Sequence, residues 1–111
     1  MKIIYSKILP PKGYAAINIC SILFVRKGIN PSPTLINHEN IHTHQIKELL
    51  YIFFYILYIL EFIFRLIQYR NWNQAYRNIS FEREAYSNEG NYMYLSNRRR
   101  FNFIRYLNIN K

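Results

Sequence analysis

The hydrophobic positions of this chain follow two different patterns along its length. Near the N-terminus, residues 3–9 and 14–26 form short runs rich in Ile, Val, Phe and Tyr, which is typical of β-strands. Between them, Pro-Pro-Lys-Gly at positions 10–13 is a turn sequence. The pattern predicts a small β-hairpin or edge strand within residues 1–30, with Cys20 buried in its second strand.

The middle of the chain has a helical pattern. Residues 34–89 contain neither Gly nor Pro. Just before this block, Ser32 is a suitable N-cap and Pro33 a suitable first helical residue. Polar clusters at 71–73 and 78–80 predict that the block is divided into separate helices.

The last third of the chain predicts two further helices. Ser80 is expected to cap a helix whose first turn contains Glu82 and Glu84, as the helix dipole favours. After Gly90, the basic segment 96–111 has apolar residues at helical spacing, which predicts a C-terminal helix. We therefore expect a mainly helical α+β fold with three to four helices.

The apolar run at residues 49–60 (LLYIFFYILYIL) contains no charged residue. It is short for a membrane span, which needs about 20 residues. A more polar stripe recurs at helical spacing through and beyond the run, formed by Tyr51, Tyr55, Tyr58, Glu61, Arg65 and Tyr69. We predict a buried core helix here, while the basic residues that follow it (Arg70, Arg77 and Arg98–Arg100) leave contact with an anionic membrane surface open.

Composition and charge narrow the classes of function. The chain has 15 Lys and Arg against 6 acidic residues, a net charge of +9. All the acidic residues are Glu, which excludes Asp-based chemistry such as aspartic proteolysis or an EF-hand. The single cysteine excludes an internal disulfide and a Cys-based zinc ribbon. The N-terminus lacks the uninterrupted apolar run of a signal peptide, so we predict a cytoplasmic or membrane-associated location.

The strongest chemical signal is the sequence His-Glu-Asn-Ile-His at residues 38–42, an H-E-x-x-H pattern on a predicted helix. Imidazoles at i and i+4 project from one helix face about 6 Å apart, close enough to bind one metal ion. The Glu between them can reach a water molecule bound to that ion. His38 and His42 are therefore candidate metal ligands, and Glu39 is the candidate general base.

This motif resembles that of the zincin metallopeptidases, and in particular of the gluzincins, in which a Glu on a later helix is the third ligand. Gln45 extends the motif to H-E-x-x-H-x-x-Q, a form found in small bacterial zincin-like families, and the resemblance implies that it supports a ligand. His44 lies about 200° around the helix from His42, so we expect it to face away from the metal.

The third ligand is expected among five carboxylates: Glu48, Glu61, Glu82, Glu84 and Glu89. Residues 80–86 (SFEREAY) resemble the F-E-x-E-A segment of the same bacterial families and the E-x-x-A-D box of membrane-bound prenyl proteases. This resemblance implies Glu82 as the ligand, with Glu84 as the alternative. Tyr86 stands where that box has an Asp beside a His ligand, so it is the candidate for that supporting position.

Chain geometry adds a condition. If residues 34–68 formed one straight helix, position 68 would lie about 39 Å beyond His42, too far for Glu82 to return to the metal unless the connecting segment were fully extended. A Glu82 ligand therefore requires the chain to turn within residues 48–58, with the apolar run packed antiparallel to the metal helix.

The resemblance implies one minimal zincin-like domain: a β segment at 1–30, metal-binding helices at 33–95 and a basic C-terminal helix at 96–111. It implies a Zn²⁺-dependent metallopeptidase that hydrolyses peptide bonds in peptide or protein substrates with a metal-activated water. A peptide could add as a strand to residues 15–25. The alternatives are a catalytically inactive, zincin-like protein associated with membranes, and a nucleic-acid-binding protein that uses Arg98–Arg100 and neighbouring aromatic residues.

Overall fold

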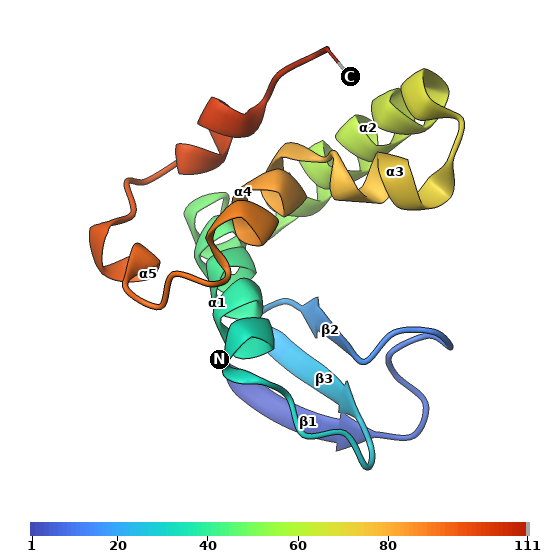
Figure 1. Ribbon diagram of the computed structural model, residues 1–111, viewed down its shortest axis with the longest axis vertical. Helices are drawn as coiled ribbons and strands as arrows, with labels where there is room; N and C mark the ends of the chain where they lie inside the picture. The colour runs from blue at the N-terminus through green and yellow to red at the C-terminus, as the bar shows by residue number, and fades with distance from the viewer. Residues whose placement is uncertain (111) are drawn as a thin grey trace.

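The computed structural model describes residues 1–110 and has a mainly helical α+β fold, as predicted. These residues form five α-helices where three to four were expected, because the C-terminal part is divided into short helices. Figure 1 shows a small sheet at one end of the molecule, helix α1 beside it, and the remaining helices at the other end. The candidate metal helix is therefore the element that joins the sheet to the helical part.

The sheet has three strands, β1 (Lys2–Ser6), β2 (Ala16–Ile19) and β3 (Ile22–Arg26), in the order β1-β3-β2. β1 pairs parallel to β3 and β2 pairs antiparallel to it, so the predicted hairpin between residues 3–9 and 14–26 is wrong. The second predicted strand is itself a hairpin, because Cys20 and Ser21 adopt positive φ values of 51° and 69° that suit a two-residue turn. Cys20 is consequently exposed in this turn and not buried in a strand.

Helix α1 (Pro33–Glu48) begins where the sequence predicts. The Ser32 hydroxyl accepts a hydrogen bond from the backbone N–H of Leu35 at 3.1 Å, and Pro33 occupies the first turn. The side chain of Asn18 in β2 donates to the backbone oxygen of Glu39 and to the Thr43 hydroxyl, each at 3.0 Å. These bonds fix the edge strand of the sheet against the metal helix.

The chain turns sharply after α1, which meets the condition for a Glu82 ligand. Leu50 and Tyr51 have φ values of 55° and 66° between α1 and helix α2 (Ile52–Tyr69). The packing of α2 differs from the prediction, because α2 contacts helix α3 (Trp72–Arg77) more than it contacts α1. Nor is α2 a buried core helix, since only Phe54 and Arg65 in it are buried.

The predicted breaks at 71–73 and 78–80 are confirmed, because α3 lies between them and helix α4 (Ser80–Asn88) follows. Ser80 is not the N-cap of α4, however; that position is Ile79. The Glu61 carboxylate of α2 performs the capping instead, by accepting from the Ser80 backbone N–H at 2.5 Å and from its hydroxyl at 2.6 Å.

The predicted helix over 96–111 is not observed in the described part of that segment. Two short helices replace it, α5 (Tyr94–Asn97) and the 3₁₀ helix η1 (Asn102–Tyr106). Between them the Arg98 backbone is extended, and its guanidinium forms ion pairs with Glu48 at 2.8 Å and Glu84 at 2.5 Å. These long-range bonds, together with the positive φ of Phe101, interrupt the local helical pattern.

The apolar core lies where α1, α2, α4 and η1 meet. It consists of Ile46, Phe54, Ile79, Phe81 and Phe103. The ring of Phe81 is central, with centroids 4.6 Å from that of Phe54 and 4.5 Å from that of Phe103. This cluster holds the first turn of α4, which includes Glu82, against α1.

Candidate metal centre

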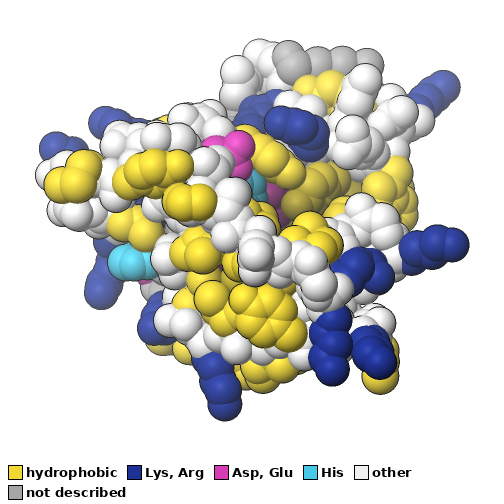
Figure 2. All heavy atoms as spheres, turned by 60° about the horizontal axis from the view of Figure 1, so that its bottom comes forward, with side chains coloured by type: hydrophobic (Ala, Val, Ile, Leu, Met, Phe, Trp, Pro, Cys, Tyr) yellow, Lys and Arg dark blue, Asp and Glu magenta, His cyan; other side chains and the backbone are white. Residues whose placement is uncertain are grey.

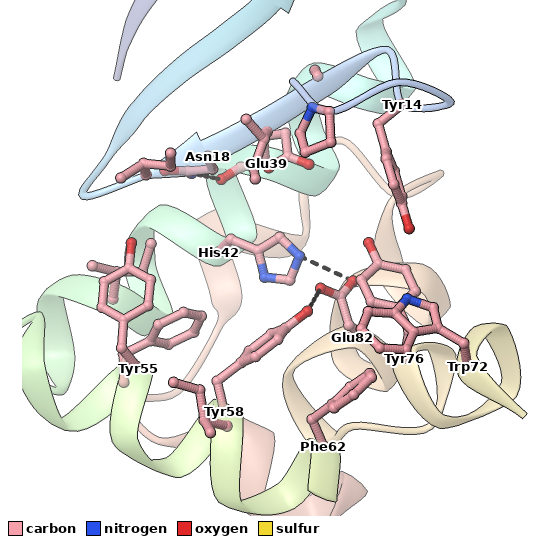
Figure 3. Close-up of a pocket in the computed structure, with 17 residues that line it drawn as sticks. Tyr14, Asn18, Glu39, His42, Tyr55, Tyr58, Phe62, Trp72, Tyr76 and Glu82 are labelled. Carbon is pink, nitrogen blue, oxygen red and sulfur yellow. Dashed lines mark hydrogen bonds and ion pairs between the residues drawn. The ribbon is translucent and has the colours of Figure 1, made fainter. Parts of the chain in front are cut away.

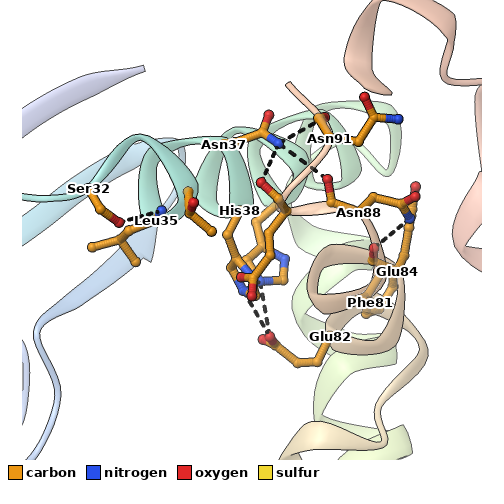
Figure 4. Close-up of polar contacts among 12 residues, drawn as sticks. Ser32, Leu35, Asn37, His38, Phe81, Glu82, Glu84, Asn88 and Asn91 are labelled. Atoms are coloured by element: carbon orange, nitrogen blue, oxygen red, sulfur yellow. Dashed lines mark hydrogen bonds and ion pairs between the residues drawn. The ribbon is translucent and has the colours of Figure 1, made fainter. Parts of the chain in front are cut away.

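Two imidazoles of α1 meet at a buried point. His38 and His42 are one helical turn apart, and their exposed fractions are 4% and 6%. Their Nε2 atoms lie 3.1 Å from one another. The helix therefore presents the two rings on one face, as the H-E-x-x-H spacing predicts, and Figure 4 shows His38 pointing from α1 toward Glu82.

Helix α4 adds a carboxylate to this pair. The Oε1 atom of Glu82 lies 3.2 Å from Nε2 of His42 and 3.3 Å from Nε2 of His38, and the residue is 3% exposed. The three atoms form a nearly equilateral triangle. Ligands at tetrahedral positions around an ion with bonds of 2.0–2.1 Å are about 3.3 Å apart, so the triangle has the dimensions of one face of such a site.

The outer nitrogens of both rings are already bonded to acceptors. Nδ1 of His42 donates to the Gln45 amide oxygen at 2.8 Å, and Nδ1 of His38 donates to Oε2 of Glu89 at 2.8 Å. When the rings are neutral, as metal ligands are, these bonds place the proton on Nδ1 and leave a free lone pair on each Nε2. Two lone pairs and the Glu82 oxygen then point at one location, an arrangement that a cation between them stabilises.

The pKa values of His42 and Glu82 also indicate that positive charge is stabilised at this point. Burial by itself lowers the pKa of His42, but the charge of Glu82 and the hydrogen bond to it outweigh burial and raise the pKa to about 10. Without an ion, a proton on Nε2 of His42 therefore supplies the positive charge beside Glu82, and a bound metal ion would take the place of that proton. Burial likewise raises the pKa of Glu82, yet the charge of His42 and the hydrogen bonds from both imidazoles hold it far below its ordinary value. The carboxylate thus stays ionised, as a metal ligand must.

Glu39 lies beside the triangle and not in it. Metal-binding atoms of His38, Glu39 and His42 all lie within 4.8 Å of one another, so this buried group can hold a metal ion. Burial raises the pKa of the Glu39 carboxyl, although the two His residues oppose the shift. A carboxylate with a raised pKa next to a metal site has the properties of a general base.

A cleft of about 560 Å³ leads to the site. Its wall on one side is β2, and on the other sides it is α2 and α3, while Glu39, His42 and Glu82 are at its base (Figure 3). The lining is mostly aromatic and aliphatic, including Tyr14, Phe54, Tyr55, Tyr58, Phe62, Trp72 and Tyr76. Seen from outside, a His side chain and carboxylates are visible in and beside a hollow surrounded by hydrophobic side chains (Figure 2).

The other candidate ligands are engaged elsewhere. Glu84 is fully buried and accepts from Gln45, Tyr94 and Arg98. Glu48 accepts a hydrogen bond from Arg98 as well. Glu61 accepts from the backbone N–H of Ser80 at the start of α4. Among the candidate Glu residues, therefore, only Glu82 has an oxygen beside both imidazoles. His44 is exposed and faces away from the centre, as predicted.

Gln45 and Tyr86 both contact a candidate ligand, but in different ways. Gln45 orients His42 through its oxygen, while its amide nitrogen donates to the backbone oxygen of Phe81 at 3.1 Å. Tyr86 packs edge-on against the His38 ring, with centroids 4.5 Å apart. The hydrogen bond that an Asp would supply at this position comes instead from Glu89, one turn later on the same side of the chain.

Three residues that support the candidate metal centre were not predicted in that role from the sequence: Glu89, Tyr58 and Asn37. Glu89 was one of five possible ligands. It is the C-cap of α4, and its spacing of seven residues from Glu82, two helical turns, is a signal that the two side chains lie on the same side of that helix. Tyr58 of α2 donates its hydroxyl to Oε2 of Glu82 at 2.7 Å. Asn37 donates to the backbone oxygens of Asn88, Glu89 and Asn91, which ties the end of α4 to α1. Nothing local in the sequence identifies the last two.

Comparisons of the chain with protein-family models, curated protein sequences and solved structures give no match. The arrangement of the residues themselves is therefore the basis for any assignment of function.

Proposed function

We propose that this protein is a zinc-dependent metallopeptidase of the gluzincin kind, with His38, His42 and Glu82 as ligands and Glu39 as general base. The observation that supports it most is the triangle of two Nε2 atoms and one carboxylate oxygen, with sides of 3.1 to 3.3 Å, at the base of a cleft. His38 and His42 are on one helix and Glu82 on another, which is the division that the resemblance implies.

The donor set favours zinc over other ions. Two imidazoles and one carboxylate, with the fourth position directed into a cleft, is a common set for catalytic zinc. Ca²⁺ and Mg²⁺ require more oxygen ligands than the described residues supply here. Gln45 and Glu89 each accept from the outer nitrogen of a His, an arrangement typical of His ligands to zinc.

Zinc bound at such a site lowers the pKa of a bound water towards 7. With zinc held by His38, His42 and Glu82, the Glu39 carboxylate would accept a proton from the attacking water and would pass it to the leaving amine. Its raised pKa suits the first role, because a stronger base accepts the proton more readily. Tyr76 lines the cleft beside Glu82 and is our candidate for donating a hydrogen bond to the developing oxyanion. Arg77, a neighbour of Tyr76 in the sequence, instead packs over the ring of Tyr86, with its guanidinium carbon 4.1 Å from the ring centroid.

The cleft defines the class of substrate. β2 is an edge strand and forms one wall, so an extended peptide can pair with it. The opposite wall is aromatic and aliphatic, which favours a peptide with a large apolar side chain near the cleaved bond.

The test is cleavage of a random peptide pool by the full-length protein loaded with zinc, with products detected by mass spectrometry. We expect cleavage next to apolar residues. Glu39→Gln should retain zinc and lose activity by about 10² to 10⁴-fold, because only proton transfer is removed. His44→Ala is the matched control on the same helix and should keep full activity, since His44 faces solvent.

Two results would contradict the proposal. Equal cleavage by wild type and Glu39→Gln would mean that the activity does not belong to this site. Stoichiometric zinc without cleavage of any peptide would favour the alternative of a catalytically inactive zincin-like protein.

A further inference from the structure

The outer face of α2 is apolar and uncovered. Nine of its large apolar side chains are between 42% and 74% exposed: Ile52, Phe53, Ile56, Leu57, Ile59, Leu60, Ile63, Phe64 and Ile67. At 100° per residue they fall within one arc of about 160°, along the full length of the helix. Exposed apolar surface that is continuous on this scale marks a binding surface.

The charged residues of α2 are turned away from this arc. Arg65 is 1% exposed and binds backbone oxygens of Asn108 and Asn110, while Glu61 caps α4. Tyr55 and Tyr58 also point inward, to the Cys20 N–H and to Glu82. The polar stripe that the sequence shows therefore faces the protein, and the outer arc contains no charge.

The rest of the surface is cationic. All six Glu residues are buried or half-buried, and none is exposed. Among residues 1–110, ten basic side chains are exposed: Lys2, Lys7, Lys12, Lys27, Lys47, Arg70, Arg77, Arg99, Arg100 and Arg105. On the face shown in Figure 2, Lys and Arg project around the periphery, while carboxylates are visible only in and beside the hollow.

We propose that the outer face of α2 docks onto the surface of an anionic lipid bilayer. Apolar side chains that enter the interface, combined with cationic groups attracted to anionic headgroups, are the two components of peripheral membrane binding. A second copy of this chain is disfavoured as the occupant because it too has a net charge of +9 and, among residues 1–110, no exposed Glu side chain to offer.

The packing of α2 indicates that it lies along the membrane and does not cross it. By length and composition α2 is able to span a bilayer. Its inner side, however, contacts α3 and caps α4, so those polar elements would have to enter the hydrocarbon with it. Insertion of the outer arc alone leaves every inward contact in place.

Docking of this kind would bring the cleft to the membrane. Tyr55, Tyr58 and Phe62 line the cleft from α2, and Ile59 both lines it and is 58% exposed. If the proposed peptidase function holds, its substrates would be apolar peptide segments at the lipid surface. The docking itself does not depend on that function.

The test is flotation of the full-length protein with vesicles of phosphatidylcholine, with and without phosphatidylglycerol. We expect binding to the anionic vesicles, weakened by salt, and a blue shift in the emission of Trp72, the single tryptophan, which lies 64% exposed just after α2. The variant I56Q/I63Q/I67Q should bind at least about tenfold more weakly. The control I8Q/I104Q, at exposed positions outside α2, should bind like wild type.

Zinc content separates this proposal from the proposed function, because the three α2 substitutions lie outside the metal centre and should leave the metal unchanged. Equal binding of wild type and the α2 variant would overturn the proposal. So would a dimer without lipid that the α2 variant abolishes, or retention on nucleic acid with no binding to anionic vesicles.

Discussion

Helices α1 and α2 are consecutive, yet they distribute polarity in opposite ways. α1 buries six polar side chains (Asn37, His38, Glu39, His42, Thr43 and Gln45) and only two apolar ones, Ile41 and Ile46. α2 is far more apolar but buries only Phe54 and Arg65. A soluble helix ordinarily turns its apolar side inward, so both helices depart from the usual arrangement.

This difference in polarity concerns how the buried polar side chains are compensated. Every buried polar side chain of α1 named above contacts another group or lies in the candidate metal centre, so the burial is offset by hydrogen bonds and by the proposed ion. The inward side of α2 is likewise the polar one. The proposed metal centre would account for the polar interior of the molecule, and the proposed contact with lipid would account for the apolar outer surface of α2.

The largest effect is expected on the free energy of unfolding. It distinguishes whether stability comes from the apolar core around Phe81 or from the outer face of α2. Phe81→Ala should reduce the free energy of unfolding by about 3–5 kcal/mol, because the ring is fully buried against two others. Phe53→Ala, the matched change on the α2 face, should alter it by less than about 0.5 kcal/mol. Chemical denaturation of both variants measures this. Similar losses would mean that the outer face is covered within the protein itself.

A second prediction concerns the support of the metal ligands. Glu89→Ala should weaken metal affinity by about 10- to 100-fold, because His38 loses the acceptor that orients its ring. Titration calorimetry with zinc measures the change. Ser87→Ala, at an exposed position in the last turn of α4, two residues before Glu89, is the control and should bind as wild type. An unchanged affinity in Glu89→Ala would show that the Glu89 bond does not support the ligand.

A smaller effect is expected from pH. Burial raises the pKa of Glu84, but hydrogen bonds from Arg98, Tyr94 and Gln45 outweigh it and hold the pKa below the ordinary 4.5. Above pH 4.5 its contribution to stability is complete. As the pH falls below 4.5 the unfolded chain binds a proton first, so this contribution is lost.

Thermal unfolding of wild type and Glu84→Gln at several acidic pH values checks this prediction. The gap between the two proteins should narrow as the pH falls, since the variant has no carboxylate to protonate. A gap that stays constant with pH would mean that the ion pair with Arg98 does not control the titration.

The smallest effect is a predicted absence of change. Ile63→Gln should leave both the free energy of unfolding and the zinc content near their wild-type values, because the side chain is 49% exposed and distant from the metal centre. Denaturation and elemental analysis measure the two quantities. A marked loss of either would show that the α2 face contributes to the fold.

The sequence predicted those parts that depend on local signals. The Ser32–Pro33 start of α1, the breaks after α2 and α3, and the turn that Glu82 requires were all foreseeable from caps, polar clusters and chain geometry. The same holds for the mutual approach of His38 and His42, which helical spacing fixes.

The features that depend on long-range contacts could not be predicted. Parallel pairing of β1 with β3 is not encoded in either strand alone. The C-terminal segment has helical spacing, but Arg98 is held in an extended conformation by Glu48 and Glu84, residues distant in sequence. The exposure of α2 was not predicted, because an apolar run indicates only that its side chains are removed from water. It does not indicate whether they pack against protein or against lipid.

The most direct measurement of the central claim is the metal content of the full-length protein, determined by elemental analysis after purification without chelator or His-rich tag. We predict about one zinc per chain in wild type, in His44→Ala and in Glu84→Gln, and loss of that zinc in His42→Ala and Glu82→Gln. A wild-type protein without stoichiometric metal, or zinc that persists in His42→Ala and Glu82→Gln, would contradict the account.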